Sequence, residues 1–235
     1  MARKFTSASE YFTLADDAAL TLPNGDWSLG GWFKITNNAG IYQQWFFNWN
    51  AYSRPYLYAF VFEASAASGA NEIKIGVHDG TNFTLLTGTS TPGTSTAWQH
   101  LLLVRSGNTI TQYIDGAADG SSNTSITAVD AGVDLHMGGR GVGETNYNFL
   151  GELAGWAKWD RALSTAERAG LAAGASAAHY PLSLAWNMPM RGDLIENKSF
   201  IAVTNNGTTV SAHPTIATPL NIPTIQPALQ PTLAW

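Results

Sequence analysis

Two groups of aromatic and polar residues stand in predicted loops and could bind a sugar. The first group lies in and around one loop and consists of Trp45, Trp49, Tyr52, Arg54 and Tyr56. The second group lies in a later loop and consists of Arg140, Glu144, Asn146 and Tyr147. Ligand sites combine aromatic surfaces with a few polar groups that fix orientation. The candidate glycan-binding residues are therefore Trp49, Tyr52, Arg54, Arg140 and Tyr147, with the alternative that aromatic residues such as Trp45 and Tyr56 serve the core or a subunit contact.

Hydrolysis of a glycosidic bond needs two carboxylates at a fixed separation, about 5 Å or about 6.5–9.5 Å according to mechanism. The glutamates are isolated from one another along the chain, and they are Glu10, Glu63, Glu72, Glu144, Glu152, Glu167 and Glu196. The run E-x-D-x-x-E does not occur, and neither does the G-x-S-x-G turn of serine hydrolases. We therefore expect a protein that is not an enzyme.

Metal binding has little support in the spacing of the histidines, none of which stands in an H-E-x-x-H pattern. Calcium would take clustered oxygen ligands. Aspartates in predicted turns or at strand ends could supply them, namely Asp79, Asp115, Asp119, Asp130 and Asp134. Turns also use aspartate for their own hydrogen bonds. We expect no cofactor, with Ca²⁺ as the alternative and no ligand assigned.

Short strands with glycine-rich turns must position these residues. Residues 27–35 alternate with a period of two, which is the signature of a strand. Further strands are predicted at 45–49, 56–62, 72–77, 98–105, 109–114 and 149–159. Residues 106–108 form the turn of a hairpin. This pattern favours an all-β, antiparallel two-sheet sandwich or jelly roll over a parallel α/β fold.

One short helix is predicted after Ser164. Ser164 and Glu167 have the spacing of a capping box, alanines follow, and Gly174 is a plausible stop. We expect two to three helical turns at the edge of the sandwich.

Three blocks of sequence resemble the concanavalin A-like jelly roll in its laminin-G-like, pentraxin-related branch. They are S-L-G-G-W-F-K at 28–34, W-Q-H-L-L-L-V at 98–104 with Y-I-D-G at 113–116, and F-L-G-E-L at 149–153 with W-D-R-A-L-S at 159–164 and Glu167. The likeness covers roughly residues 5 to 175. It implies two antiparallel sheets packed face to face, a structural role for His100, and calcium as the usual ion. Ala154 and Gly155 replace an acidic pair found in many members, which argues for a domain kept for its shape.

Composition excludes several classes of protein. The formal net charge is −5 and only 12% of residues are charged, so neither nucleic acid nor an anionic membrane surface is expected as a partner. Cysteine is absent, which excludes disulfides, thiol catalysis and Cys-ligated zinc. No apolar run has the length of a signal peptide or a membrane span, so we expect synthesis in a host cytoplasm and no membrane insertion.

The C-terminal residues 199–235 carry no Asp, Glu, Lys or Arg, and prolines recur in them every four or five residues. Such spacing prevents a helix or a central strand. We therefore divide the chain into a domain at 1–178, a segment at 179–211 that closes the sandwich, and an extended apolar arm at 212–235. The arm is expected to bind a neighbouring subunit, or else its own sandwich, through Ile216, Leu220, Ile222, Ile225, Leu229, Leu233 and Trp235.

Together these features predict a non-catalytic structural protein on the surface of a virus particle, and a bacteriophage is the kind of virus that we expect. It would be a decoration or tail-associated accessory with a lectin-like domain, a homo-oligomer held to capsid or tail protein by its arm. The alternative is a carbohydrate-binding module or adhesin that recognises glycans on a host cell. A hydrolase is the third reading, and the scattered carboxylates count against it.

Overall fold

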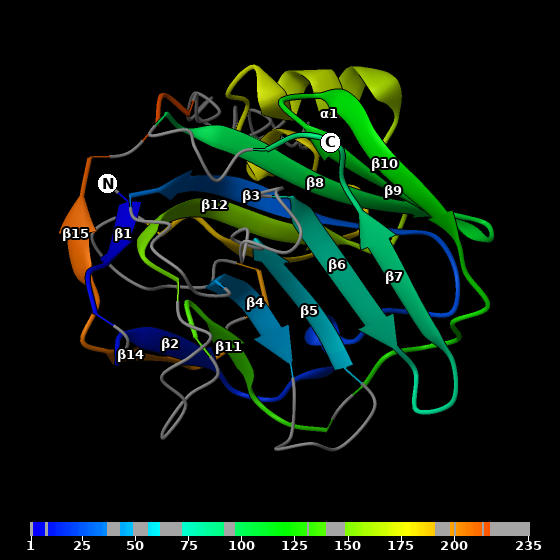
Figure 1. Ribbon diagram of the computed structural model, residues 1–235, viewed down its shortest axis with the longest axis horizontal. Helices are drawn as coiled ribbons and strands as arrows, with labels where there is room; N and C mark the ends of the chain where they lie inside the picture. The colour runs from blue at the N-terminus through cyan, green and yellow to red at the C-terminus, as the bar shows by residue number, and fades with distance from the viewer. Residues whose placement is uncertain are drawn as a thin grey trace, which may run out of the picture.

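The chain forms two antiparallel sheets packed face to face in a computed structural model (Figure 1). The structure describes residues 2–7, 9–36, 43–48, 56–61, 72–91, 97–130, 132–139, 149–190, 198–199, 201–212 and 214–216. The architecture confirms the predicted jelly-roll sandwich with one short α-helix.

The first sheet has eight strands and contains the three blocks of the family resemblance. Its order is β10 (Ala117–Asn123), β9 (Thr109–Ile114), β8 (Gln99–Ser106), β3 (Trp27–Ile35), β12 (Gly151–Trp159), β1 (Ala2–Phe5) and β15 (Thr209–Ser211), with β13 (Leu184–Met188) also paired to β12. The strand predicted at 27–35 has these bounds, and the predicted hairpin joins β8 to β9.

The second sheet has seven strands. Its order is β14 (Val203–Asn206), β2 (Tyr11–Leu14), β11 (Leu135–Met137), β4 (Gln43–Asn48), β5 (Tyr56–Val61), β6 (Ile73–His78) and β7 (Phe83–Thr87). Two 3₁₀ turns, η1 (Ala18–Leu20) and η3 (Ala177–His179), and the helix α1 (Thr165–Ala172) complete the elements used below.

The main core lies between the sheets and follows from strand alternation. Trp27, Leu29, Phe33 and Ile35 of β3 point inward and are buried, as their period of two predicts. The second sheet contributes alternate residues of its own strands, which are Phe12, Leu14, Ile73, Ile75, Val77, Leu86, Leu135 and Met137.

A second, smaller core lies on the outer face of the eight-stranded sheet. Leu102, Val104 and Trp159 pack there against Leu163 and Leu171 beside α1. Figure 1 shows α1 lying over this sheet near β8, β9 and β10. This sheet is therefore apolar on both sides, and the helix covers one of them.

The helix begins and ends as the capping residues predict. The Ser164 side chain accepts a hydrogen bond from the Glu167 backbone, and the Glu167 carboxylate accepts one from the Ser164 backbone. Glu167 also forms two hydrogen bonds with the Arg161 guanidinium, at 2.7 and 2.8 Å. Gly174, with φ +98°, follows the last turn.

Residues after the helix return to both sheets. β13 pairs with β12, β14 pairs with β2 at the edge of the second sheet, and β15 pairs with β1 at the edge of the first. The chain from 184 to 211 therefore adds one strand to each sheet edge and a further partner to β12.

Candidate functional site

The outer face of the seven-stranded sheet carries a polar and aromatic cluster on β2 and β11. Tyr11 and Thr13 alternate with the buried Phe12 and Leu14, so strand geometry turns them outward. His136 lies opposite Thr13 in the register of β11 and also faces outward. All three side chains are half-buried. Within the described part of the chain, no helix covers them.

His136 is held in place by its neighbours. Its Nδ1 lies 3.3 Å from the Thr13 hydroxyl, and the rings of His136 and Tyr11 have centroids 5.6 Å apart. Burial lowers the pKa of His136, while the nearby Asp134 carboxylate acts in the opposite sense. A lowered pKa keeps the imidazole neutral at neutral pH, so it offers one hydrogen-bond donor and one acceptor rather than a charge.

The other end of the same face carries exposed apolar side chains on β7. Phe83 and Leu85 are 49% and 45% exposed, which is unusual for large hydrophobic residues among the described ones. Beside them in the register lies His78, whose ring centroid is 6.2 Å from that of Phe83. The His78 Nδ1 accepts a hydrogen bond from Gly80 N at 2.8 Å.

The strand register connects these two ends across the sheet. His136 pairs with Thr13 on one side and with Phe47 on the other; Phe47 pairs with Tyr58, and Leu85 completes the row through β6. Residues opposite one another in antiparallel strands share a face. In the strand register the row therefore runs from β2 to β7.

The predicted glycan-binding residues Trp49, Tyr52 and Arg54 lie outside the described residues. The strands that flank them end at Asn48 and begin at Tyr56. Tyr56 pairs with His78, and His78 with Phe83, so this loop joins the sheet at the end that carries Phe83.

Arg140 and Tyr147, together with Glu144 and Asn146, also lie outside the described residues. The strand before them, β11, runs from Leu135 opposite Asn48 to Met137 opposite Phe46. The second loop therefore leaves the sheet from the end opposite to the first, and the register does not bring the two loops to one edge.

The aspartates considered as calcium ligands are engaged in turns. Asp79 accepts hydrogen bonds from the backbone and side chains of Asn82 and Thr127, which hold its pKa well below its usual range against the opposing effect of burial. Asp115 accepts from His100 N at 2.7 Å, and Asp130 from Gly132 N at 2.9 Å. The described residues contain no group of three His, Asp or Glu side chains arranged to hold a metal ion.

Asp119 is a buried carboxylate with a structural environment. It accepts hydrogen bonds from Thr89 N at 3.1 Å, Ser90 N at 2.7 Å and Gln112 Nε2 at 2.6 Å. These bonds lower its pKa, although burial alone would raise it. The carboxylate ties the segment after β7 to β9 and β10, where the edges of the two sheets meet.

The residues of the family blocks also serve the fold. The Ser28 hydroxyl donates to Arg161 O at 2.9 Å and accepts from Leu163 N at 3.0 Å. His100 is fully buried, packs edge-on against Trp32 at 5.2 Å, and has its pKa lowered to about 4 by burial. A neutral, enclosed imidazole agrees with the structural role that the resemblance implies for it.

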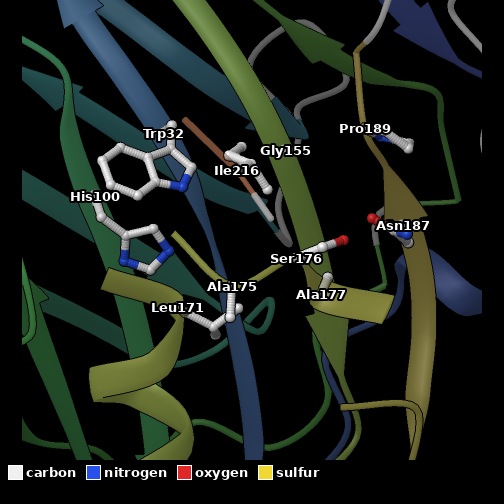
Figure 2. A pocket seen from close by; sticks show the side chains of 10 residues that line it. All are labelled: Trp32, His100, Gly155, Leu171, Ala175, Ser176, Ala177, Asn187, Pro189 and Ile216. Carbon is white, nitrogen blue, oxygen red and sulfur yellow. The ribbon is translucent and has the colours of Figure 1, made fainter. Parts of the chain in front are cut away.

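Ile216 is the one predicted arm residue that the structure describes. It lies against its own domain, beside Trp32 and Gly155 on the outer face of the eight-stranded sheet (Figure 2). The other six predicted arm residues, from Leu220 to Trp235, lie outside the described residues.

Sequence reasoning missed Tyr11, Thr13, His136, Phe83 and Leu85. Residues 83–87 read F-T-L-L-T, and 11–14 read Y-F-T-L, so a period of two was present in both. Each run is short, and its alternation indicates which residues share a face of the strand. It does not indicate which of the two faces is exposed to solvent. Only the pairing of β2 with β11 brings Tyr11 and His136 together.

The fold is that of a lectin-like sandwich. The chain belongs to the concanavalin A-like lectin/glucanases superfamily, since its laminin-G-type family model matches residues 6–167. A comparison with curated protein sequences gives no match. Among the described residues, no helix has the length and apolarity needed to cross a membrane.

Solved structures share this fold at low sequence identity. One is a protein from Bacteroides ovatus described as carbohydrate-binding, with a TM-score of 0.69 and 15% identity over 92% of this chain and 61% of that one. Another is the heptameric SAP-like pentraxin of Limulus polyphemus, with a TM-score of 0.60 and 15% identity over 88% of this chain and 93% of that one. A third is the CBM40 module of a Ruminococcus gnavus IT-sialidase bound to α2,3-sialyllactose, with a TM-score of 0.54 and 10% identity over 73% of this chain and 96% of that one. The chain thus spans less than two thirds of the first of these proteins.

Proposed function

We propose that this domain binds carbohydrate without catalysis, through the outer face of its seven-stranded sheet. The observation that carries the proposal is the row of outward residues that begins at the half-buried Tyr11 and His136 and ends at the exposed Phe83 and Leu85. The outer face of the other sheet is covered by α1. Structural neighbours described as carbohydrate-binding support the proposal.

The chemistry of the face suits a neutral sugar. Aromatic and apolar side chains provide a surface for the C–H face of a pyranose ring, and neutral polar groups bind its hydroxyls. The lowered pKa of His136 keeps it neutral at neutral pH, and on β6 the Lys74 ammonium lies 3.5 Å from the Glu72 carboxylate. The face therefore has no concentration of one charge among its described residues, and we expect weak dependence of binding on salt.

A glycan screen followed by titration calorimetry tests the proposal. Tyr11→Ala should weaken binding roughly tenfold if the sugar lies at the β2 end of the row, and Phe83→Ala should do so if it lies at the β7 end, as expected for loss of one aromatic contact. Leu182→Ala is the matched control, because Leu182 is 71% exposed but lies outside the seven-stranded sheet. Equal affinity in all three variants, or no glycan bound by the wild type, would contradict the proposal.

The loops predicted from sequence can be tested with the same glycan. The loops that contain Trp49 and Tyr147 join opposite ends of the sheet. A comparison of Trp49→Ala with Tyr147→Ala therefore shows at which end the sugar binds. A loss confined to Trp49→Ala would place the sugar toward Phe83, and a loss confined to Tyr147→Ala would place it toward the other end.

A second function, compatible with the first, is attachment to a virus particle, and the composition of the C-terminal region favours it. Residues 217–235 contain no charged residue and end in Trp235, so an exposed arm would gain from burial on a neighbouring capsid or tail subunit. We propose a bacteriophage decoration or tail-associated protein, active as a homo-oligomer on the virion surface.

Co-sedimentation with particles from the native source tests this second proposal. A chain ending at Ile216 keeps every described contact of the domain and loses only residues 217–235. It should stay in the supernatant while the full chain sediments with the particle. Sedimentation of both chains, or of neither, would argue against anchoring by the arm.

A further inference from the structure

The outer face of the eight-stranded sheet contains a small groove beside α1. Its cavity measures about 20 Å³, and its walls come from β3, β8, β12 and β13 and from the segment between α1 and η3. Figure 2 shows Ile216 next to Gly155, with the neighbouring rings of Trp32 and His100 on one side of it and Leu171 and Ala175 below. The space holds about one water molecule, so the groove is filled by the protein itself.

The segment that fills the groove is Pro214–Ile216. Pro214 is buried, Thr215 is exposed and Ile216 is half-buried, which is the in–out–in pattern of an extended chain on a surface. Proline restricts the backbone before docking, which reduces the entropy lost on ordering.

Two glycines make room for this segment. A Cβ atom on Gly155 would lie 3.0 Å from Ile216 Cδ1, and one on Gly174 would lie 2.5 Å from the Thr215 carbonyl oxygen. Gly155 stands where the register between β12 and β3 shifts, and Gly174 follows the last turn of α1. The groove thus matches the backbone of the segment as well as its side chains.

The sequence repeats the docked tripeptide. Pro214-Thr215-Ile216 is followed by three further copies of the pattern Pro-(Thr/Ala)-(Ile/Leu), at 223–225, 227–229 and 231–233. The pattern occurs nowhere earlier in the chain. The copy at 223–225 is identical to the docked one.

We propose that this groove is a docking site for the Pro-Thr-Ile motif of this chain. Its first copy occupies the groove of its own domain, and the later copies are alternative ligands for the same groove. The proposal goes beyond glycan binding and concerns the opposite face of the sandwich. Under this proposal, the C-terminal region is a series of motif copies, each of which can bind the groove.

The absence of cysteine from the chain allows a direct test in the full-length protein. In the variant Ile216→Cys the single thiol reports by its labelling rate how often the segment leaves the groove. A synthetic peptide of residues 221–230 should accelerate labelling by displacing the segment. Because the effective concentration of a tethered segment is about millimolar, the peptide is added in several-fold excess over that value. A peptide of the same composition in scrambled order should leave the rate unchanged.

Backbone substitutions provide an independent measurement. Gly174→Ala in the Ile216→Cys chain should accelerate labelling roughly tenfold, because the new Cβ obstructs the Thr215 carbonyl. Gly80→Ala is the matched control, since Gly80 has a similar φ of +101° but nothing within 4 Å of a Cβ. Gly155→Ala and its control Gly132→Ala, with φ +59° and +58°, form a second pair.

Circular dichroism establishes that the compared variants are folded. An unchanged labelling rate in excess peptide would overturn recognition of the later copies, and equal rates in both glycine pairs would overturn docking of the first. Neither result bears on glycan binding, which is measured on the other sheet.

Discussion

Replacing Glu167 by Gln should destabilise the domain in a manner that depends on pH. Hydrogen bonds from Arg161 lower the pKa of Glu167 to about 2, against a usual value of 4.5, and the Ser164 backbone contributes to the same shift. The folded carboxylate therefore binds its proton less readily than the unfolded one. Its stabilising contribution is complete above about pH 4.5 and is lost as the pH falls towards about 2.

The size of the effect follows from the shift and from the exposure of the pair. Each pKa unit corresponds to about 1.4 kcal/mol, so the full shift would give about 3 kcal/mol. The side chains of Arg161 and Glu167 remain 21% and 22% exposed, so solvent screening reduces the gain. We expect Glu167→Gln to lower the free energy of unfolding by about 1–2 kcal/mol at pH 7.

Urea unfolding followed by tryptophan fluorescence at a series of pH values measures this difference. The wild type and Glu167→Gln should differ at pH 7 and converge as the pH falls to about 2. Glu72→Gln is the control, because Glu72 meets Lys74 at 3.5 Å on the surface and should change stability by less than about 0.5 kcal/mol. A Glu167→Gln difference that is constant across this pH range would refute the argument from ionisation.

Three further predictions concern packing, titration and a buried carboxylate. Gly31→Ala should destabilise by about 1–3 kcal/mol, because its Cβ would lie 2.5 Å from the Trp156 ring, whereas Gly25→Ala meets nothing within 4 Å and should be nearly neutral in the same urea assay. Burial lowers the pKa of His100 to about 4 from 6.5, so the unfolded state binds more protons and wild-type stability should fall as the pH drops from about 6.5 to 4; His100→Leu should remove that slope. Asp119→Asn should cost about 1–3 kcal/mol in urea unfolding, because the backbone N–H groups of Thr89 and Ser90 donate to one carboxylate oxygen and the Gln112 amide to the other, and an asparagine has an amide nitrogen in place of one of these acceptors; a change below about 0.5 kcal/mol would contradict this.

The sequence predicted the strands that alternate strongly and the helix that carries its own capping signals. Residues 27–35 and 109–114 match β3 and β9, and α1 begins after Ser164. Weakly patterned strands escaped prediction. β10 reads A-A-D-G-S-S-N, which has little β-propensity, and it forms because the turn at Asp115–Gly116 returns the chain beside β9.

The candidate site was less accessible to sequence reasoning because it is assembled by long-range pairing. Tyr11 and His136 are far apart in the chain and meet only through the register of β2 and β11. The glycan-binding residues predicted from sequence were neighbours along the chain, because a cluster of aromatic residues close together in sequence can be recognised without the structure. The sheet instead gathers single outward residues from successive strands.

The pattern within each strand explains why the two outer faces differ. β8 reads L-L-L-V at 101–104 with every residue buried, so both of its faces are apolar and its outer face must be covered. β7 reads F-T-L-L-T with its buried residues alternating, so it supports one core, and Phe83 and Leu85 on its other side are exposed. Coverage by α1 and by Pro214–Ile216 on the first sheet, and the exposed side chains of β7 on the second, thus both follow from the residue pattern within the strands. In keeping with this difference, we propose the seven-stranded sheet for glycan binding, and the groove on the eight-stranded sheet for the chain's own C-terminal motif.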